Sequence, residues 1–461
     1  MTQAKHLLPN FSGSVIVPDH PEYESARRVW NGMIDKRPAL IARCTSATDV
    51  KAALAYAQAE GLPIAVRGGA HNVAGNATID GGMVIDLSRM KDIRVDARKR
   101  LAFADPGLTW GEFDATTQAH GLATTGGLVS TTGIAGFTLG GGIGWLMRKH
   151  GLTVDNLVAA ELVTAEGELL RASESENKDL FWALRGGGGN FGIVTRFEYR
   201  AHPVTQVIGG LTLYPAVRAG AMLRFFREIA DSAPDELTLL FAFLTAPPAP
   251  FVPEHLRMKP VAAIVLCYTG DLAEGERILK PIKAFGPPAV DLIGPMPYPA
   301  LQAMLDAGAP AGMQNYWKAA YLPAVSDAAI DVLVEHSSRM RSPLSQVHLH
   351  QMGGAVARVP KEATAFVHRD AAYAMNIVGI WPDPAENEMH TRWAREFADA
   401  MAPHATGGVY VNFLGNEGKE RVRAAYGGEA YARLIEVKTK FDPNNVFHLN
   451  QNIEPRRSAS R

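Results

Sequence analysis

Two histidines separated by one residue, His348 and His350, lie in the segment 346–354. In a strand both side chains point to the same face, because side chains alternate along a strand. A neutral imidazole, with an ordinary pKa of about 6.5, can take a proton from a substrate alcohol or amine near neutral pH. Two adjacent imidazoles also disfavour double protonation. We therefore expect a general base at His348 or His350.

The same pair leaves a metal site open as an alternative. Two histidines on one strand face suit zinc or iron when a third ligand lies nearby, and His368 is the nearby candidate. A metal-dependent hydrolase built on this strand would lose its activity with a chelator. Histidines without any role are a further alternative. We favour the general base and expect no metal.

Glycine is the unusual component, with 44 glycines in 461 residues and three clusters in the first two hundred. The clusters lie at 67–72, 126–144 and 186–192. Glycine permits positive φ and close backbone approach, and consecutive amides can form concave anion sites. One such loop would suggest a tight turn at a crowded sheet edge. Three in one unit favour a cofactor whose pyrophosphate is held without Lys or Arg.

The run 187–192 matches G-x-G-x-x-G, the fingerprint of a dinucleotide-binding turn. That turn requires a strand before it and a helix after it. Here 179–184 is typical of a helix and 193–195 of a strand, so the order is reversed. We therefore do not expect a Rossmann NAD site. The chain also lacks a P-loop motif and a G-x-S-x-G nucleophile elbow.

The first two hundred residues predict alternating strands and helices, an α/β or α+β unit. The apolar spacing of 47–60 predicts a helix, and Ser46 with Asp49 can cap its start. The predicted strands are 62–66, 83–86, 158–164 and 193–199.

From about residue 206 glycine thins out and proline rises, which predicts a separate part of the chain. An antiparallel sheet covered by helices fits this part. Its predicted strands are 209–214, 261–268 and 346–350, and its predicted helices are 217–232 and 327–340. A third part begins near 405, with a strand at 410–413 and a helix at 430–440. In that strand Tyr410 and Asn412 would share one face.

Composition and charge exclude several classes of protein. Lys plus Arg is 46 and Asp plus Glu is 47, for a net charge of −1. We therefore expect no nucleic-acid partner, which would require clustered cations. No apolar run approaches the roughly 18 residues of a membrane helix, and the N-terminus has no signal-like segment. With only Cys44 and Cys267, we expect a cytoplasmic protein with reduced thiols.

The set of motifs from about 38 to 453 resembles the vanillyl-alcohol-oxidase superfamily, in its berberine-bridge-enzyme-like branch. The resemblance includes the loops 67–72 and 126–144, with Asp155-Asn156-Leu157 following. It also includes the run 179–188, the Asp442-Pro443 turn and the final segment 450–453. Within the branch, 41–45 and 353–360 look similar to the flavin oxygenase type of enterocin biosynthesis.

This resemblance implies an α+β fold with a two-part FAD-binding domain and a substrate domain whose antiparallel sheet is covered by helices. The implied boundaries are 1–205 and 405–461 for FAD binding and 206–404 for the substrate. It implies a covalent bond between the His71 ring and the flavin. Bicovalent members carry a second, cysteine attachment where this chain has Val129. Valine cannot form a thioether, so we expect FAD held by one covalent bond.

The resemblance also implies which residues surround the cofactor. They are Arg67, Gly68, Gly69, Ala70, His71, Asn72, Gly75, Thr131, Thr132, Gly133, Gly136, Gly141, Gly142, Gly144, Gly192, Ile193, Val194, Tyr410, Asn412, Asn450 and Gln451.

Other residues are expected to act on the substrate or on dioxygen. Relatives carry a catalytic Glu on the strand that here holds His348 and His350, and a Tyr over the active site where this chain has Tyr410. Phe137 matches a position that faces the substrate. Thr132 matches a position that gates dioxygen, although packing in a glycine-rich turn is an equal alternative for it.

The sequence therefore predicts an FAD-dependent oxidase with a small-molecule substrate. It would remove a hydride from a C–H next to oxygen or nitrogen, and dioxygen would reoxidise the flavin to give hydrogen peroxide. A flavin-dependent oxygenase acting on a polyketide-like metabolite is the first alternative, and a non-enzymatic flavin-binding protein is another. Which of His348, His350 and Tyr410 is the base stays open, as does the oligomeric state.

Overall fold

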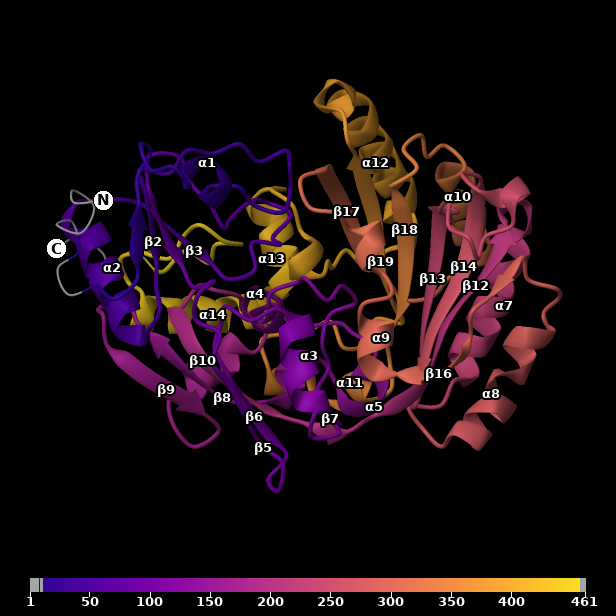
Figure 1. Ribbon diagram of the computed structural model, residues 1–461, viewed down its shortest axis with the longest axis horizontal. Coiled ribbons are helices and arrows are strands. Elements are labelled where there is room, and N and C mark those ends of the chain that lie inside the picture. The colour runs from indigo at the N-terminus through magenta and orange to yellow at the C-terminus, as the bar shows by residue number, and fades with distance from the viewer. Residues whose placement is uncertain (1–7, 9–10, 457–461) are drawn as a thin grey trace.

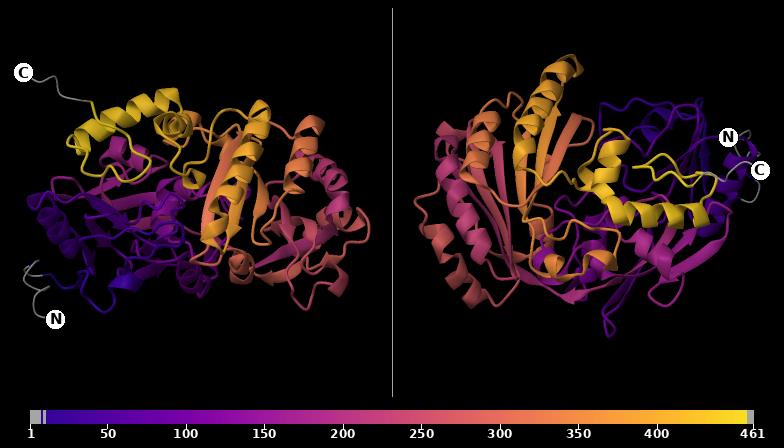
Figure 2. Two further views of the ribbon diagram at one scale, coloured as in Figure 1. Left: turned by 90° about the horizontal axis from the view of Figure 1, so that it is seen from above. Right: turned by 180° about the vertical axis from the view of Figure 1, so that it is seen from behind.

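The computed structural model describes residue 8 and residues 11–456. The first two hundred residues form two small sheets, and residues 206–381 form one large sheet beside them (Figure 1). The segment after residue 405 leaves the large sheet and lies again on the first half, as both views of Figure 2 show.

The first small sheet has four strands in the order β1-β2-β4-β3, and β2, β4 and β3 are parallel. Its strands are β1 (Ser14–Ile16), β2 (Leu40–Arg43), β3 (Ile64–Arg67) and β4 (Met83–Asp86). Helix α1 (Tyr23–Ala26) precedes β2, and α2 (Ala47–Ala59) joins β2 to β3. Ser46 caps α2 as predicted, because its hydroxyl accepts from Asp49 N.

The second small sheet is antiparallel, in the order β5-β6-β10-β8-β9. Its strands are β5 (Ile93–Asp96), β6 (Leu101–Ala104), β8 (Leu157–Val163), β9 (Leu169–Ser173) and β10 (Ile193–Arg200). Around it lie α3 (Trp110–Gln118), α4 (Ile134–Leu139) and α6 (Lys178–Leu184), with the short pair β7 (Leu122–Ala123) and β11 (His202–Pro203). Helix α5 (Met147–His150) instead contacts the large sheet described next. Helix α6 precedes β10, which confirms the order predicted around the run 187–192.

The large sheet is antiparallel throughout, in the order β15-β12-β14-β13-β18-β19-β17, with β16 beside β12. Its strands are β12 (Gln206–Pro215), β13 (Leu237–Thr245), β14 (Pro260–Tyr268), β15 (Val290–Asp291), β16 (Gly294–Pro297), β17 (Gln314–Leu322), β18 (Gln346–Gln351) and β19 (Tyr373–Trp381). The accompanying helices are α7 (Ala219–Ser232), α8 (Leu272–Ala284), α9 (Tyr298–Gln302), α10 (Asp327–Ser337), α11 (Ala355–Arg358) and α12 (Asn387–Met401).

Alternation divides this sheet into two different faces. Val347, Leu349, Met375 and Ile377 point to one face, where they join the core under α7, α10 and α12. Residues between them in the sequence point the other way, toward the first half of the chain. In Figure 1 strands β17–β19 lie nearest the middle of the molecule, so this second face is presented to the glycine-rich loops.

The last part of the chain carries α13 (Lys419–Tyr426) and α14 (Gly428–Phe441), and α14 packs against α6. The strand predicted at 410–413 is wrong: Val411–Phe413 is a turn of 3₁₀ helix. Phe413 N donates to Tyr410 O at 2.9 Å, which closes the turn. Among residues 11–456, no helix combines the length and the apolar character that crossing a membrane demands.

Candidate active site

One large cavity lies where the glycine-rich loops, the inner face of the large sheet and the C-terminal segment meet. The first half contributes the loops 68–72, 127–137 and 188–194. Strands β17, β18 and β19 contribute side chains from 317 to 380, and the C-terminal segment contributes 411–413 and 447–451. Segments far apart in the sequence thus enclose one space.

Two glycines hold the first two loops in direct contact. A Cβ on Gly69 would lie 2.5 Å from both N and Cα of Gly133, and a Cβ on Gly133 would lie 2.4 Å from Gly69 N. Real Cβ atoms do not approach backbone this closely, so only glycine fits at both positions. The crossing leaves backbone amides of both loops beside the cavity.

Alanine at Gly69 is therefore expected to push these loops apart and to weaken flavin binding by at least about tenfold, a loss of about 1.4 kcal/mol, so that the purified protein contains less flavin. The measurement is the ratio of visible to protein absorbance after purification. Gly428→Ala is the control, because a Cβ there meets nothing within 4 Å. Full flavin loading of Gly69→Ala would contradict the role given to the crossing.

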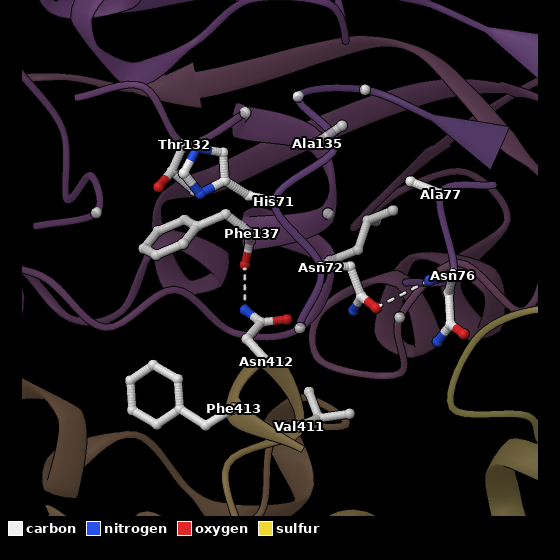
Figure 3. A pocket seen from close by; sticks show the side chains of 18 of the residues that line it. His71, Asn72, Asn76, Ala77, Thr132, Ala135, Phe137, Val411, Asn412 and Phe413 are labelled. Atoms are coloured by element: carbon white, nitrogen blue, oxygen red, sulfur yellow. Dashed lines mark hydrogen bonds between the residues drawn. The ribbon is translucent and has the colours of Figure 1, made fainter. Parts of the chain in front are cut away.

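His71 stands at the edge of the cavity, beside Thr132 (Figure 3). Its ring stacks on Trp30 with centroids 5.0 Å apart, and its Nε2 lies 3.1 Å from Thr131 Oγ1. Burial lowers the pKa of His71 to about 4, so the ring is neutral at pH 7. The contact with Thr131 fixes the ring through Nε2 and leaves Nδ1 as the nitrogen available to another group.

The loop that follows His71 is held by its own side chains and by a buried arginine. Asn72 Oδ1 accepts from Asn76 N at 3.2 Å, a bond drawn in Figure 3. Arg67 donates to the carbonyl oxygens of Ala26, Ala77 and Arg27. Its guanidinium therefore fixes backbone behind the cavity instead of facing into it.

The C-terminal segment contacts the second glycine-rich loop through Asn412. Asn412 Nδ2 donates to Phe137 O at 3.0 Å, as Figure 3 shows, and to Tyr410 Oη at 2.8 Å. Tyr410 Oη also accepts from Gly142 N at 2.8 Å, and burial raises the pKa of Tyr410 to about 12. Tyr410 is not among the described residues that line the cavity, and its contact with the substrate stays a prediction.

A buried ion pair holds the rest of this segment in place. Lys438 Nζ bonds Asp442 Oδ2 at 2.6 Å and donates to the carbonyl oxygens of Asn190 and Phe447. Both charged side chains are fully buried. The pair joins α14 to the loop 187–192 and to the residues that lead into 449–451, which line the cavity.

Strand β18 presents three polar side chains to the cavity: Gln346, His348 and His350. Gln346 Nε2 donates to Gly308 O at 3.1 Å, and Gln346 Oε1 lies 2.8 Å from His348 Nε2. A carbonyl only accepts, so the amide nitrogen of Gln346 faces Gly308 and its oxygen faces His348. His348 Nε2 must then carry the proton, which leaves the lone pair on Nδ1.

Burial keeps both histidines neutral. It lowers the pKa of His348 to about 4 and that of His350 well below its ordinary value. Their rings meet edge to face with centroids 5.6 Å apart. His350 Nε2 is buried without a hydrogen-bond partner among the described residues. Both imidazoles are therefore in the form that accepts a proton at pH 7.

Most of the predicted site residues line this cavity. Those that do are Gly68, Gly69, Ala70, His71, Asn72, Thr132, Gly133, Gly136, Phe137, Gly192, Ile193, Val194, His348, His350, Asn412, Asn450 and Gln451. Those that do not are Arg67, Gly75, Thr131, Gly141, Gly142, Gly144 and Tyr410.

For this second set direct cofactor contact stays a prediction, and close packing accounts for its glycines. Gly142 leaves space for Thr153, and Gly144 for the carbonyl of Gly126. A Cβ on Gly75 would meet Ile34 at 2.6 Å. Gly141 has φ +126° beside Phe366 and Tyr410. Glycine is needed at these positions because neighbouring atoms leave no room for a Cβ atom.

The two side-chain amides predicted to face the flavin make different hydrogen bonds. Gln451 lines the cavity, but its Nε2 donates to the carbonyl oxygens of Leu414 and Gly415. Asn450 donates through Nδ2 to Phe447 O, while its Oδ1 is buried without a partner among the described residues. Asn450 Oδ1 is therefore free to accept a hydrogen bond.

Other residues line the cavity although the sequence did not predict them there: Trp30, Trp317, Gln346, Asn376 and Phe413. Gln346 could have been predicted from the sequence, because it precedes His348 by two residues and therefore lies on the same face of the strand. Asn376 lies opposite His348 in the neighbouring strand β19, a register that local sequence does not show.

The metal alternative has no support in the geometry. Among residues 11–456, no three His, Cys, Asp or Glu side chains gather in a way that could hold a metal ion. His368 Nε2 lies 3.0 Å from the carbonyl oxygens of both Ala424 and Ala425. Its ring is thus bound to backbone and not to the pair on β18.

The residues present fit FAD. Glycine-rich backbone and the polar face of β18 both line the cavity, and Asn450 Oδ1 is one of its buried polar atoms without a partner among the described residues. No Lys or Arg side chain is among the described lining residues, so backbone amides and neutral side chains would bind an anion here. The paired glycines at 69 and 133 form the close backbone cradle that such binding requires.

Comparisons with known proteins agree with this geometry. A family model described as an FAD binding domain matches residues 38–173, and one described as berberine and berberine like matches residues 409–454. An FAD-linked oxidoreductase of Dictyostelium discoideum is 31% identical, covering 97% of this chain and 95% of its own length.

The (R)-6-hydroxynicotine oxidase of Paenarthrobacter nicotinovorans is 32% identical and is matched over 97% of either chain. The crystal structure of 6-hydroxy-D-nicotine oxidase from Arthrobacter nicotinovorans has a TM-score of 0.87 at 29% identity, covering 97% of this chain and 98% of that one. Because these likenesses extend along almost the entire chain, it belongs to the berberine-bridge-enzyme-like branch of the FAD-linked oxidoreductases.

Proposed function

We propose that the protein is an FAD-dependent oxidase that removes a hydride from a C–H next to oxygen or nitrogen of a small molecule. The observation that carries this proposal is the pair of neutral imidazoles of β18 facing the glycine-rich loops across one cavity. Bound FAD would supply the hydride acceptor and pass the electrons to dioxygen, giving hydrogen peroxide. A related enzyme, by name, oxidises (R)-6-hydroxynicotine.

In this proposal the residues of the chain position the substrate and move its proton. His348 takes the proton of the substrate heteroatom at Nδ1, and Gln346 keeps the ring in the tautomer that allows this. Phe137 and Phe413 border the space in which the substrate lies. Thr132 is the small side chain at the point where we expect dioxygen to approach.

The proposal includes one covalent bond, from His71 to the flavin. Two features support it: Nδ1 of His71 has no hydrogen-bond partner among the described residues, and stacking on Trp30 fixes the ring. Val129 also lines the cavity and cannot form a second bond. We further propose that 1–205 and 405–461 form the FAD-binding part and 206–404 the substrate part.

Acid precipitation of the purified protein tests the bond to His71. We expect the yellow colour to stay with the pellet of the wild-type protein and to pass to the supernatant with His71→Ala. His255→Ala, at an exposed position, should behave as wild type. Colour retained in the His71→Ala pellet would contradict this assignment.

The reaction itself is tested by anaerobic mixing with a panel of alcohols, sugars and amines. Bleaching of the flavin by one of them, followed on aeration by peroxide in step with product, supports the oxidase. Product that carries labelled oxygen from dioxygen would instead indicate an oxygenase. A flavin that stays oxidised with every member of the panel would contradict both.

A further inference from the structure

The substrate end of the cavity carries no formal charge. No Asp, Glu, Lys or Arg is among the described lining residues. The three lining histidines have lowered pKa values and are neutral at pH 7. Asp306 is close by in sequence to the lining residue Leu305, but its two carboxylate oxygens accept from N and Oγ of Ser130. A charged substrate would therefore be buried there without a counter-charge, which is costly.

Two buried polar groups at this end lack hydrogen-bond partners among the described residues. Asn376 Oδ1 and His350 Nε2 are both in this state, and their side chains are only 2% and 4% exposed. Both residues line the cavity. A buried polar atom without a partner is unfavourable, so these atoms mark this end of the cavity as a surface that binds a polar group of a ligand.

Asn376 and His348 are direct neighbours across strands β18 and β19. The side chains of directly opposite residues lie close enough together to bind the same small group of a ligand. His348 Nδ1 carries a lone pair, and a carboxamide such as that of Asn376 both accepts and donates. A hydroxyl matches this pair of neighbours, because its one proton can go to His348 Nδ1 while its oxygen accepts from the amide nitrogen of Asn376.

The remaining surface around these polar groups is apolar. Val378 and Ile380 follow Asn376 on the same face of β19, and the rings of Trp317 and Phe413 lie at the cavity. Trp317 Nε1 already donates to Asn315 Oδ1 at 3.2 Å, so its ring presents only its apolar surface to a ligand. The polar contacts at this end are therefore few and concentrated on β18 and β19.

We propose that the substrate is an uncharged, largely apolar molecule held by a single hydroxyl between Asn376 and His348, and that Asn376 selects it. This inference rests on the oxidase function proposed above. Asn376 binds and orients the hydroxyl while His348 takes its proton. The apolar walls hold the carbon skeleton, and the absence of a counter-charge excludes substrates that are cations or anions.

The test compares three probes of similar shape and different charge: benzyl alcohol, benzylammonium and benzoate. Each is titrated at pH 7.5 into the flavin-loaded enzyme, and binding is read from the shift of the visible flavin spectrum and from calorimetry. We expect benzyl alcohol to bind at least about tenfold more tightly than either ion. Equal affinities, or no binding of the alcohol, would overturn the proposal.

Two variants at Asn376 sharpen this test. Asn376→Ala should weaken binding of benzyl alcohol by about tenfold and leave the ions unchanged, as expected for one lost hydrogen bond. Asn376→Asp adds a carboxylate and should reverse the order, so that benzylammonium binds most tightly. Asn387→Asp is the matched control, because it adds the same charge at the start of α12 and keeps the acceptor for Trp381 Nε1. An unchanged order in Asn376→Asp would remove Asn376 from substrate selection.

Anaerobic flavin reduction, recorded separately, distinguishes the two proposals. Preferential reduction by charged compounds would overturn the substrate class and leave the oxidase standing. A preference for the alcohol in binding, with a flavin that no alcohol in a wider panel reduces, would support the substrate class and overturn the oxidase.

Discussion

Replacement of His348 by alanine is expected to slow anaerobic flavin reduction by about 10²- to 10⁴-fold, the usual contribution of a general base. The expectation rests on the hydrogen bond between His348 Nε2 and Gln346, which leaves Nδ1 free to accept the substrate proton. The measurement is stopped-flow absorbance at saturating substrate. Flavin content should not change, because His348 lies on the sheet and not on the glycine-rich loops.

His350→Ala, made in parallel, identifies which imidazole takes the proton. If His348 is the base, His350→Ala should be slowed less, because it loses only a neighbour of the reacting group. His255→Ala, at an exposed position, is the control and should reduce at the wild-type rate. Wild-type rates in both the His348 and the His350 variants would remove the β18 pair from the mechanism.

The pH profile gives an independent measure of the same base. Since the pKa of His348 is lowered to about 4, the imidazole is neutral throughout the physiological range. The rate of flavin reduction should therefore be constant from pH 7.5 down to about pH 5 and fall only as the pH approaches 4, where protonation removes the lone pair. A decline centred near an ordinary histidine pKa of about 6.5 would contradict the buried, neutral base.

Loss of the buried ion pair between Asp155 and Arg369 is expected to give the largest fall in stability. Arg369 Nη2 lies 2.7 Å from Asp155 Oδ1, and Nη1 lies 3.0 Å from Oδ2. The two side chains are 1% and 8% exposed. Asp155→Ala leaves a buried guanidinium without its charge partner, which typically lowers the free energy of unfolding by about 3–5 kcal/mol.

Urea unfolding followed by circular dichroism measures this loss. The control is Glu454→Ala, which breaks an ion pair with Lys419 at the surface. The side chain of Lys419 is 84% exposed and that of Glu454 is 56% exposed. That change should cost about 1 kcal/mol or less. The double variant Asp155→Leu with Arg369→Met should regain most of the stability, because no charge is then left buried. A loss below about 1 kcal/mol in Asp155→Ala would show that the pair is not a main support of the fold.

The same pair also supports the chemistry. Asp155 follows the second glycine-rich loop, whereas Arg369 lies between β18 and β19 and donates as well to Thr364 Oγ1 at 2.7 Å. The pair therefore links the part that carries the glycine loops to the two strands that carry His348 and Asn376. A weakened link should reduce flavin content together with stability.

The local sequence pattern was sufficient to predict those features that depend on a single strand or helix. Strand β4 has the predicted bounds, and the alternation of 346–350 correctly placed His348 and His350 on one face of β18. The same reasoning failed at 410–413, because four residues of alternating polarity also fit a 3₁₀ turn, and only a neighbouring strand would have made them a strand. Tyr410 is consequently not among the described residues that line the cavity.

Other site residues depend on contacts that local sequence does not contain. Asn376 reaches His348 through the register of β18 and β19, and Trp30 reaches His71 from a loop 41 residues earlier in the chain. The glycine-rich loops predicted the cofactor cavity, but not every glycine in them lies at the cavity. Gly69 and Gly133 do form the cavity wall, whereas Gly142 and Gly144 are glycines because Thr153 and Gly126 lie against them.

The two faces of the large sheet have a consequence for how such an enzyme can acquire new substrates. Helices and core residues cover one face, and the cavity lies on the other, so folding and recognition depend on separate sets of side chains. A library restricted to the cavity face should yield mostly folded, flavin-loaded variants with altered preferences. The positions for it are Asn376, Val378 and Ile380, which line the cavity and leave the histidines of β18 in place.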